Sequence, residues 1–177
     1  MIMAEDFGMT INGTNKYYMT GKIAIVGAAA TGKDYLRKRM MDRGFEYGVS
    51  CTTRLPREGE VHGKDYYYLT IEEFDAKIER GEFAEWQEFN GWKYGLTKDE
   101  FERCDVMILN AEAVTLLEQD YRDRVFVIYL DIPESIRRER LGIRDDKNDS
   151  TDRRIAADNL QFGNFFDFDC KITNENF

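Results

Sequence analysis

The stretch KIAIVGAAATGKDYL, residues 22–36, decides the fold that this sequence predicts. Its first five residues form a continuous apolar run, which is typical of a strand buried on both faces of a parallel sheet. Gly27 and Gly32 then bracket a turn, and residues 33–44 have the spacing of a helix that ends at a glycine. This order of strand, glycine loop and helix is the context of a phosphate-binding loop, in which backbone N–H groups surround an anion.

The loop departs from the usual phosphate-binding pattern at one position. Lys33 stands where it can reach the terminal phosphates of a nucleotide, but Asp34 replaces the serine or threonine that normally coordinates the metal ion. Two interpretations stay open on these residues alone. The segment is either an ordinary glycine turn or a nucleotide site that holds its metal differently.

The rest of the chain alternates strands and helices. Capping boxes predict two helices that begin after a threonine, with a glutamate three positions on: Thr70 with Glu73, and Thr97 with Glu100. Further strands are expected at 106–109, 125–130 and 170–173, and further helices at 111–119, 134–141 and 152–162. Residues 1–20 indicate an extension or an extra edge strand. The order predicts an α/β fold with a parallel sheet covered on both faces.

Composition excludes several classes of function. The chain has 177 residues and 42% hydrophobic content, which suits one domain with small appended lobes. A net charge of −9 argues against a nucleic-acid-binding surface. Its three cysteines, Cys51, Cys104 and Cys170, are too widely spaced for a zinc site or a disulfide framework. The absence of a long apolar run or leader predicts a cytoplasmic protein without membrane contact.

Two later motifs carry a specific resemblance. VSCTTRLPREGEVHGKDYYYL at 49–69 and GEFAEWQEFNGWKYG at 81–95 closely resemble the guanylate kinase family, and the resemblance extends from about residue 22 to 174. It implies a P-loop nucleoside monophosphate kinase that uses ATP and Mg²⁺ to convert GMP or dGMP to the diphosphate. It also implies three parts in a domain at 21–177. These are a core at 21–49, 97–137 and 154–177, a small mostly β GMP-binding lobe at 50–96, and a helical lid at 138–153.

The residues of these motifs agree with a site for a nucleoside monophosphate. Arg54 and Arg57 offer planar forks suited to a dianionic phosphate, and Tyr66 and Tyr94 add hydroxyl donors. The alternative for these four is a solvated loop with core aromatics.

Guanine has a distinct pattern of donors, which Ser50 and Glu85 suit. The carboxylate of Glu85 can accept from the ring N–H and the exocyclic amine, while the hydroxyl of Ser50 can donate to O6. Adenine would present a lone pair to Glu85 and leave a buried charge unpaired, which predicts strong discrimination.

The resemblance assigns residues on the donor side as well. Arg140, Arg144 and Arg154 align with arginines around the transferring phosphoryl group, and Arg144 and Asn174 with positions that flank adenine. Because phosphoryl transfer needs little covalent chemistry from the protein, Lys33 and these arginines are expected to catalyse it by charge. An exposed helix of mixed charges is the other interpretation. The loop residues expected to bind ATP are Gly27, Ala28, Ala29, Ala30, Thr31, Gly32, Lys33, Asp34 and Tyr35.

The metal-binding residues depart from the family pattern. At 109–112 the sequence has LNAE where the family usually shows L-D-x-D, so Asn110 replaces the first acid and Glu112 the second. Since Mg²⁺ in kinases needs one or two carboxylates besides water and phosphates, we expect Asp34 to bind it and to compensate for Asn110. Asn110 or Glu112 would assist through water, and Glu112 is also expected at the GMP site. The opposing interpretation is that Asp34 repels the phosphates.

Leu96 leaves the acceptor range open, because the family commonly has a small hydroxyl residue there. Thr97 is a candidate substitute, although capping a helix competes for the same oxygen. A broader deoxynucleoside monophosphate kinase is therefore one alternative. A catalytically inactive binding module is the other, and the retained loop and lid arginines favour the enzyme. The expected partners are nucleotides alone, for a monomer or a homodimer.

Overall fold

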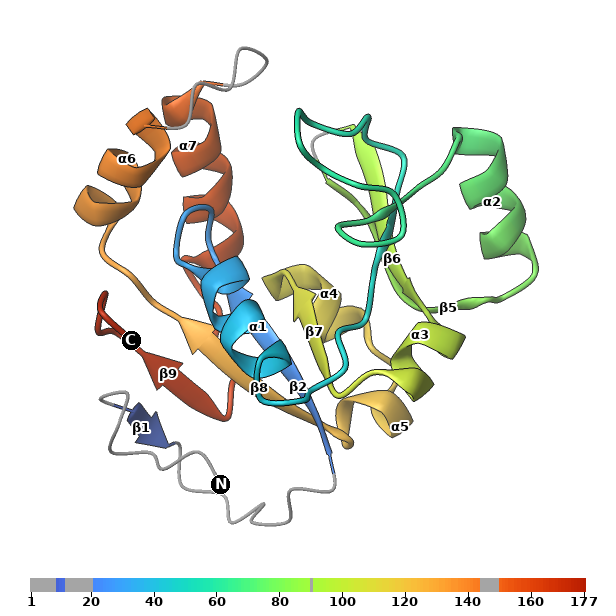
Figure 1. The fold of residues 1–177 in the computed structure, drawn as a ribbon, viewed down its shortest axis with the longest axis horizontal. Helices are drawn as coiled ribbons and strands as arrows, with labels where there is room; N and C mark the ends of the chain where they lie inside the picture. The colour runs from blue at the N-terminus through green and yellow to red at the C-terminus, as the bar shows by residue number, and fades with distance from the viewer. Residues whose placement is uncertain (1–8, 12–20, 90, 144–149) are drawn as a thin grey trace.

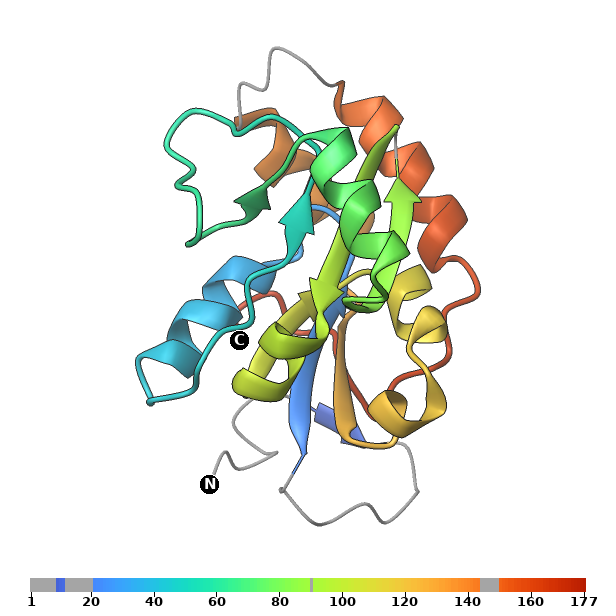
Figure 2. The same ribbon diagram turned by 90° about the vertical axis from the view of Figure 1, so that its right-hand side faces the viewer.

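The computed structural model describes residues 9–11, 21–89, 91–143 and 150–177 of the chain. A five-stranded sheet runs through the molecule, and a four-stranded sheet lies to one side of it (Figure 1). Helices cover both faces of the larger sheet, as the turned view also shows (Figure 2). This is the three-layer α/β architecture that the sequence predicts.

The larger sheet has the strand order β1-β9-β8-β2-β7, and its neighbours are parallel except for the β1–β9 pair. Its strands are β1 Met9–Ile11, β2 Lys22–Gly27, β7 Val106–Leu109, β8 Val125–Leu130 and β9 Cys170–Ile172. β2 is an interior strand of the sheet, because it pairs with β7 on one side and β8 on the other. The glycine loop therefore begins at the carboxyl end of an interior strand. Open α/β sheets bind their ligands beyond such carboxyl ends.

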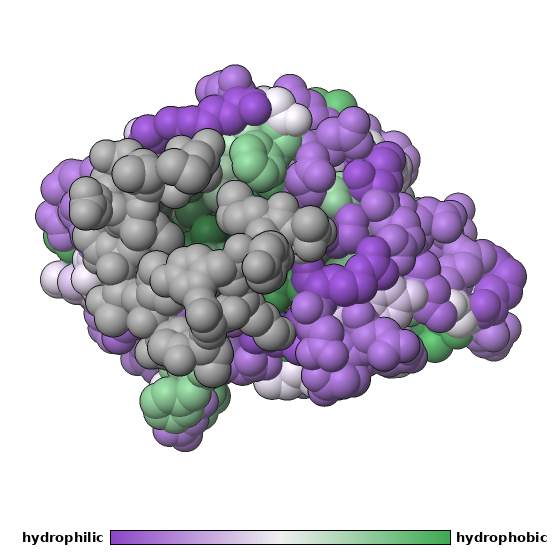
Figure 3. Space-filling view, turned by 90° about the horizontal axis from the view of Figure 1, so that it is seen from below, coloured by the Kyte–Doolittle hydropathy of each residue, from purple (hydrophilic) through white to green (hydrophobic). Residues whose placement is uncertain are grey.

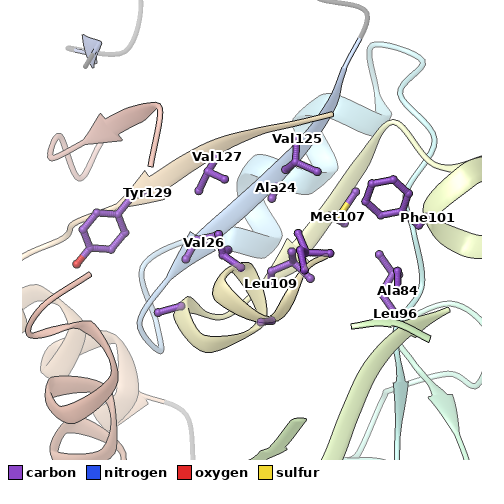
Figure 4. Close-up of a cluster of buried hydrophobic side chains, with 14 of the residues drawn as sticks. Ala24, Val26, Ala84, Leu96, Phe101, Met107, Leu109, Val125, Val127 and Tyr129 are labelled. Atoms are coloured by element: carbon purple, nitrogen blue, oxygen red, sulfur yellow. The ribbon is translucent and has the colours of Figure 1, made fainter. Parts of the chain in front are cut away.

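The two faces of β2 enter different core clusters. Ala24 and Val26 belong to the cluster that includes residues of α4 (Ala111–Leu116), whereas Ile23 and Ile25 belong to the cluster that includes residues of α1 (Lys33–Met41). Figure 4 shows the first cluster, in which Ala24 and Val26 lie beside the side chains of β7 and β8. The apolar run of β2 does not alternate with polar residues, because helices cover both faces of this strand.

Helix bounds follow the sequence pattern with one error. The single helix expected at 111–119 is wrong in extent, because α4 ends before Leu117, whose backbone is extended at φ −59° and ψ 128°. Leu117 is buried in the core, so packing overrides the helical spacing. The remaining helices on this sheet are α5 Gln119–Arg122, α6 Glu134–Ile143 and α7 Thr151–Phe162.

The smaller sheet has the order β4-β3-β6-β5 and carries α2 (Ile71–Glu79) on one face. Its strands are β3 Cys51–Thr52, β4 Tyr67–Tyr68, β5 Phe83–Phe89 and β6 Trp92–Thr97. Phe74 of α2 is fully buried and stacks on Phe83 with ring centroids 4.5 Å apart. This contact fixes the helix to the sheet.

The two predicted capping boxes differ in outcome. Thr70 and Glu73 form the complete reciprocal box at α2. Thr97 caps α3 (Lys98–Arg103) by accepting from the Glu100 N–H, but the carboxylate of Glu100 accepts from the Val49 N–H at 2.8 Å instead of reaching back. The second box is therefore only half formed, because Glu100 joins α3 to the segment before β3.

Two short segments pack on the side of the larger sheet formed by β8 and β9. Within residues 1–20, Met9–Ile11 forms the edge strand β1, which pairs antiparallel with β9. The aromatic segment after α7 packs on Tyr129 of β8, with ring centroids of Phe162, Phe165 and Phe168 between 5.3 and 5.8 Å away. Phe165 is buried in the core and Phe162 and Phe168 are partly buried against it, whereas Phe166 is 77% exposed.

Seen from below, the described surface is mostly hydrophilic, in keeping with a chain that is 33% charged (Figure 3). Across the described part of the chain, no helix is long and apolar enough to cross a membrane. The three cysteines are buried free thiols.

Candidate active site

The glycine loop at 27–32 turns tightly between β2 and α1. A Cβ on Gly27 would lie 2.9 Å from the carbonyl oxygen of Leu130, so only glycine fits against β8. Gly32 is the N-cap of α1 at φ 99°, a left-handed conformation that glycine adopts without strain. Thr31 is buried, and its hydroxyl donates to the carbonyl oxygen of Ala28 at 2.9 Å.

Ala30 has an unusual backbone conformation, and the side chain of Lys33 contacts the loop. Ala30 has φ 62°, which costs an L-residue about 1–2 kcal/mol relative to the right-handed conformation. Lys33 lies back over the loop, and its Nζ donates to the carbonyl oxygens of Gly27 and Ala28 at 2.6 and 2.8 Å. The ammonium group is thereby held above the turn.

The loop forms the floor of a cleft of about 300 Å³. In Figure 1, the loop at the end of β2 lies between the α6–α7 pair and the smaller sheet, and the cleft is lined from all three. The lining residues are Ala29, Ala30, Thr31, Gly32, Lys33, Asp34, Tyr35, Arg57, Phe89, Trp92, Tyr94, Leu141, Arg154, Ala157 and Asp158. The structure thus brings together residues from five separate stretches of the sequence.

Asp34 lies on the first turn of α1 and lines the cleft. Its side chain is 67% exposed, and one carboxylate oxygen lies 3.5 Å from a guanidinium nitrogen of Arg37. The same guanidinium nitrogen lies 3.9 Å from Asp65 in the loop before β4. The acid therefore has a positive neighbour and remains open to solvent and ligand.

Asn110 and Glu112 do not line the cleft. The Oδ1 of Asn110 accepts from the Ala113 N–H at 2.8 Å, which caps α4, and from the Nε2 of Gln87 at 2.5 Å. Glu112 is exposed on the first turn of α4. Among the described residues, no group of three or more histidines, cysteines or acids could hold a metal ion. A single exposed carboxylate such as Asp34 still fits Mg²⁺, which keeps several waters and binds phosphates.

Arg54 is buried in the smaller sheet and is already paired. Its Nη2 donates to both carboxylate oxygens of Glu60 at 2.9 and 3.0 Å, and its Nη1 donates to the carbonyl oxygen of Leu55. Glu60 also accepts from the hydroxyl of Tyr68 at 2.8 Å and the Arg57 N–H at 2.7 Å. The carboxylate of Glu60 thus accepts from Arg54, Arg57 and Tyr68. The same donors would equally suit a phosphate.

Tyr66 and Tyr94 lie close together beside Arg54. Their ring centroids are 6.1 Å apart, and the Arg54 guanidinium carbon lies 5.5 Å from the Tyr66 ring centroid. Burial raises the pKa of Tyr66 to about 12 and also raises the pKa of Tyr94. Both hydroxyls therefore stay protonated at neutral pH and can donate.

The expected base-binding residues are buried at the junction of the two sheets. Ser50 is 7% exposed and Glu85 is 6% exposed. One oxygen of Glu85 accepts from the Leu96 N–H at 2.9 Å, while the other is buried without a hydrogen-bond partner. Burial raises the pKa of Glu85 to about 8, opposed by that one hydrogen bond. An unsatisfied buried acceptor of this kind suits a ligand with N–H donors.

Two of the predicted arginines are placed near the loop by different helices, one through a hydrogen bond and one by lining the same cleft. From α6, Arg140 donates to the carbonyl oxygens of Ala30 at 3.2 Å and Glu175 at 3.0 Å, and Arg154 of α7 lines the cleft. Arg144 lies outside the described residues. Asn174 accepts from the Asn176 N–H at 3.0 Å and is not among the residues that line the cleft.

Sequence reasoning missed four polar residues that contact the expected site. Glu60 lies within the quoted motif, three residues after Arg57, so its spacing was a usable signal. Gln87 lies two residues after Glu85 on β5, and its Oε1 is buried without a partner. The other two are Arg137 and Asp158, a buried ion pair of α6 and α7. No local pattern places these two together, because 20 residues separate them in the sequence.

Comparisons with known proteins show the family of this chain. The family model described as guanylate kinase matches residues 19–177. A guanylate kinase of Geobacter metallireducens is 34% identical over 169 residues, covering 89% of this chain and 82% of the relative. One from Malacoplasma penetrans is 35% identical, covering 84% and 83%. The crystal structure of guanylate kinase from Anaplasma phagocytophilum matches with a TM-score of 0.65 at 25% identity, covering 89% of this chain and 79% of that one. The chain belongs to the guanylate kinase family.

Proposed function

We propose that this chain transfers the terminal phosphoryl group of ATP to GMP and dGMP. The observation that carries the proposal is the single cleft that is lined by Lys33 of the glycine loop, Arg57 and Tyr94 of the acceptor motifs, and Arg154 of α7. A phosphoryl donor and a monophosphate acceptor bound to these groups would meet in one cleft. In-line transfer requires that proximity above all.

On the donor side, the proposal assigns residues 27–35 to the triphosphate. Phosphate oxygens would replace the carbonyl oxygens of Gly27 and Ala28 as acceptors for the Lys33 ammonium. Arg140, Arg144 and Arg154 would stabilise the charge that develops on the transferring group, and Arg144 and Asn174 would contact the adenine. Arg140 supports this role because it already reaches the loop at Ala30.

On the acceptor side, the proposal assigns the GMP phosphate to Arg54, Arg57, Tyr66 and Tyr94. The carboxylate of Glu60 supports this assignment, because it shows that an anion is accommodated beside Arg54. Binding of the phosphate would have to compete with Glu60 for the Arg54 guanidinium. Release of Glu60 to solvent would then offset part of the binding free energy.

The proposal assigns guanine to Ser50 and Glu85, with Glu112 beside them. Glu85 supports it best, since its second carboxylate oxygen is buried and lacks a donor that guanine would supply. Leu96 is fully buried in the core and offers no hydroxyl to the base. Thr97 already uses its oxygen to cap α3, so the acceptor range has to be measured.

We assign the metal to Asp34, with Asn110 or Glu112 assisting through water. Bound Mg²⁺ would neutralise the negative charge of the phosphates. Asp34 can hold it because the carboxylate is exposed beside Lys33 in the cleft, and Arg37 limits its repulsion of phosphate.

The proposal includes a small lobe at 50–96 that binds GMP, and a lid at 138–153 that closes over both nucleotides. Residues 144–149 of that lid lie outside the described part of the chain. We place the protein in the cytoplasm, as a monomer or a homodimer. The three free thiols suit a reducing compartment.

The test is coupled release of ADP from Mg²⁺-ATP with GMP, dGMP, AMP, CMP, UMP and dTMP as acceptors. Turnover confined to GMP and dGMP is the expected result. Turnover with other bases would favour the broader nucleotide kinase and direct attention to Leu96. If no acceptor reacts and neither ATP nor GMP raises the melting temperature, the chain is a binding module instead.

A further inference from the structure

The strained turn of the glycine loop is held from outside by a carboxylate. Among the described residues, Ala30 is the only residue other than glycine with a positive φ. The preceding N–H, that of Ala29, donates to the Oδ2 of Asp158 at 2.9 Å. Asp158 belongs to α7 and is 129 positions away in the sequence, so tertiary structure alone creates the contact.

The same carboxylate oxygen is anchored by a second helix. Arg137 of α6 donates through Nη1 to the Oδ2 of Asp158 at 2.9 Å and through Nε to the carbonyl oxygen of Ile132 at 3.2 Å. Asp158 is 7% exposed and Arg137 is 6% exposed. An oxygen held in this way cannot move away from the Ala29 N–H unless α7 also moves or the ion pair breaks.

Apolar packing makes the same connection. Ala30 lies in a small buried cluster with Leu141 of α6 and Ile155 of α7, and Ala29 packs against it. The loop is thus fixed to the helix pair at two successive residues, by a hydrogen bond at Ala29 and by side-chain contact at Ala30.

Asp158 also lines the cleft proposed for ATP, as Lys33 does. A carboxylate near a bound triphosphate would by itself weaken binding through like-charge repulsion. We propose that Asp158 is a positioning residue for the phosphate loop. It orients the Ala29 N–H, keeps Ala30 in its left-handed conformation and so directs the following N–H groups towards the phosphates. Arg137 neutralises the repulsion. This inference rests on the proposed use of ATP.

The test compares two double variants that both lack the buried charges. In Arg137→Met with Asp158→Asn, the amide oxygen can still accept from the Ala29 N–H. In Arg137→Met with Asp158→Leu, a side chain of similar size cannot. We expect the leucine variant to raise the KM for ATP about tenfold relative to the asparagine variant, while the KM for GMP changes less than about twofold.

Rescue separates positioning from general damage. Ala30→Gly removes the conformational penalty, because glycine adopts positive φ freely. Added to the leucine variant, it should restore most of the affinity for ATP. Glu134→Ala is the matched control, since it breaks another α6–α7 contact, that of the Asn159 amide with the Glu134 carboxylate at 3.3 Å, without touching the loop. It should leave both KM values unchanged.

Three outcomes would overturn the inference while leaving the proposed function intact. They are equal KM values for ATP in the two double variants, parallel losses for ATP and GMP, and no rescue by Ala30→Gly. Binding of ATP by calorimetry gives the same comparison without turnover. If the wild-type chain itself neither binds ATP nor phosphorylates GMP, both proposals are wrong.

Discussion

Glu85 accepts a hydrogen bond from the Leu96 N–H at 2.9 Å through one carboxylate oxygen, and its other oxygen is buried without a partner. This relationship leaves one buried carboxyl oxygen on β5 without a hydrogen-bond partner. A ligand with two adjacent N–H donors would satisfy it, whereas in the free protein it costs stability.

The first prediction concerns pH. Burial raises the pKa of Glu85 to about 8, above the ordinary carboxyl value of 4.5, so the folded state binds the proton more tightly than the unfolded state. The contribution of Glu85 to stability should therefore fall as pH rises from about 4.5 to 8, by at most roughly 3–5 kcal/mol. Glu85→Gln should remove this slope and stabilise the free protein at pH 8, and it should abolish the preference for GMP.

The measurement is urea unfolding of wild type and variant between pH 5 and 8.5. Glu88→Gln is the control, since Glu88 is an exposed carboxylate on the same strand. The interpretation fails if the difference between wild type and Glu85→Gln stays constant across that range.

The second prediction separates the two arginines of the acceptor motif. Arg57 is half-exposed and lines the cleft, whereas Arg54 is buried and holds Glu60. Arg57→Ala should raise the KM for GMP at least about tenfold with little change in the free energy of unfolding. Arg54→Ala should raise that KM too and also lower the free energy of unfolding by about 1–3 kcal/mol, because Glu60 loses the guanidinium that pairs with both of its oxygens.

Steady-state kinetics and urea unfolding of the same preparations check both parts. Arg80→Ala, which removes an exposed ion pair with Glu82 in the same region, should change neither quantity. Equal loss of stability in Arg54→Ala and Arg57→Ala would contradict the distinction.

The third prediction tests the displaced acid. Asp34→Ser should lower turnover at a fixed, subsaturating Mg²⁺ concentration and raise the Mg²⁺ concentration needed for half-maximal rate. Asn110→Asp should then restore part of the loss, because it returns a carboxylate to the carboxyl end of β7. The aspartate can still cap α4. Asp42→Ser, at the other end of α1, serves as the control.

Titration of the rate with Mg²⁺ gives the answer, together with ATP binding measured with and without the ion. Higher activity of Asp34→Ser at every Mg²⁺ concentration would mean that Asp34 only repels phosphate.

The fourth prediction uses two glycines with the same backbone demand. Gly32 has φ 99° and Gly44 has φ 90°, but a Cβ on Gly32 would lie 2.9 Å from the Phe177 ring, whereas nothing lies within 4 Å of one on Gly44. Both alanine variants should lose about 1–2 kcal/mol of stability from the backbone alone. Only Gly32→Ala should also lose the stabilisation by ATP.

Thermal melting with and without Mg²⁺-ATP measures both effects. A normal ATP-induced shift in Gly32→Ala would show that the loop tolerates the displaced Phe177 ring and the strain.

Local sequence patterns predict most of the fold and name most of the candidate site. The apolar run at 22–26 and the glycines at 27 and 32 predict β2 and its loop, because buried parallel strands and tight turns restrict the residues that fit. The arginines and tyrosines of residues 49–95, together with Ser50 and Glu85, are named through the resemblance of their motifs to the guanylate kinase family and through the hydrogen-bonding chemistry of their side chains. Both kinds of signal lie within short stretches of the chain.

Tertiary structure alone decided the contacts between distant segments. It ends α4 at Leu117 to bury that side chain, and it turns Glu100 from a capping box to the Val49 N–H. It also brings Asp158 to the N–H of Ala29 across 129 positions. These choices depend on which groups become neighbours once the core has formed, because burial makes each unpaired polar group costly and each apolar contact favourable. That information does not reside in the spacing of residues along the chain.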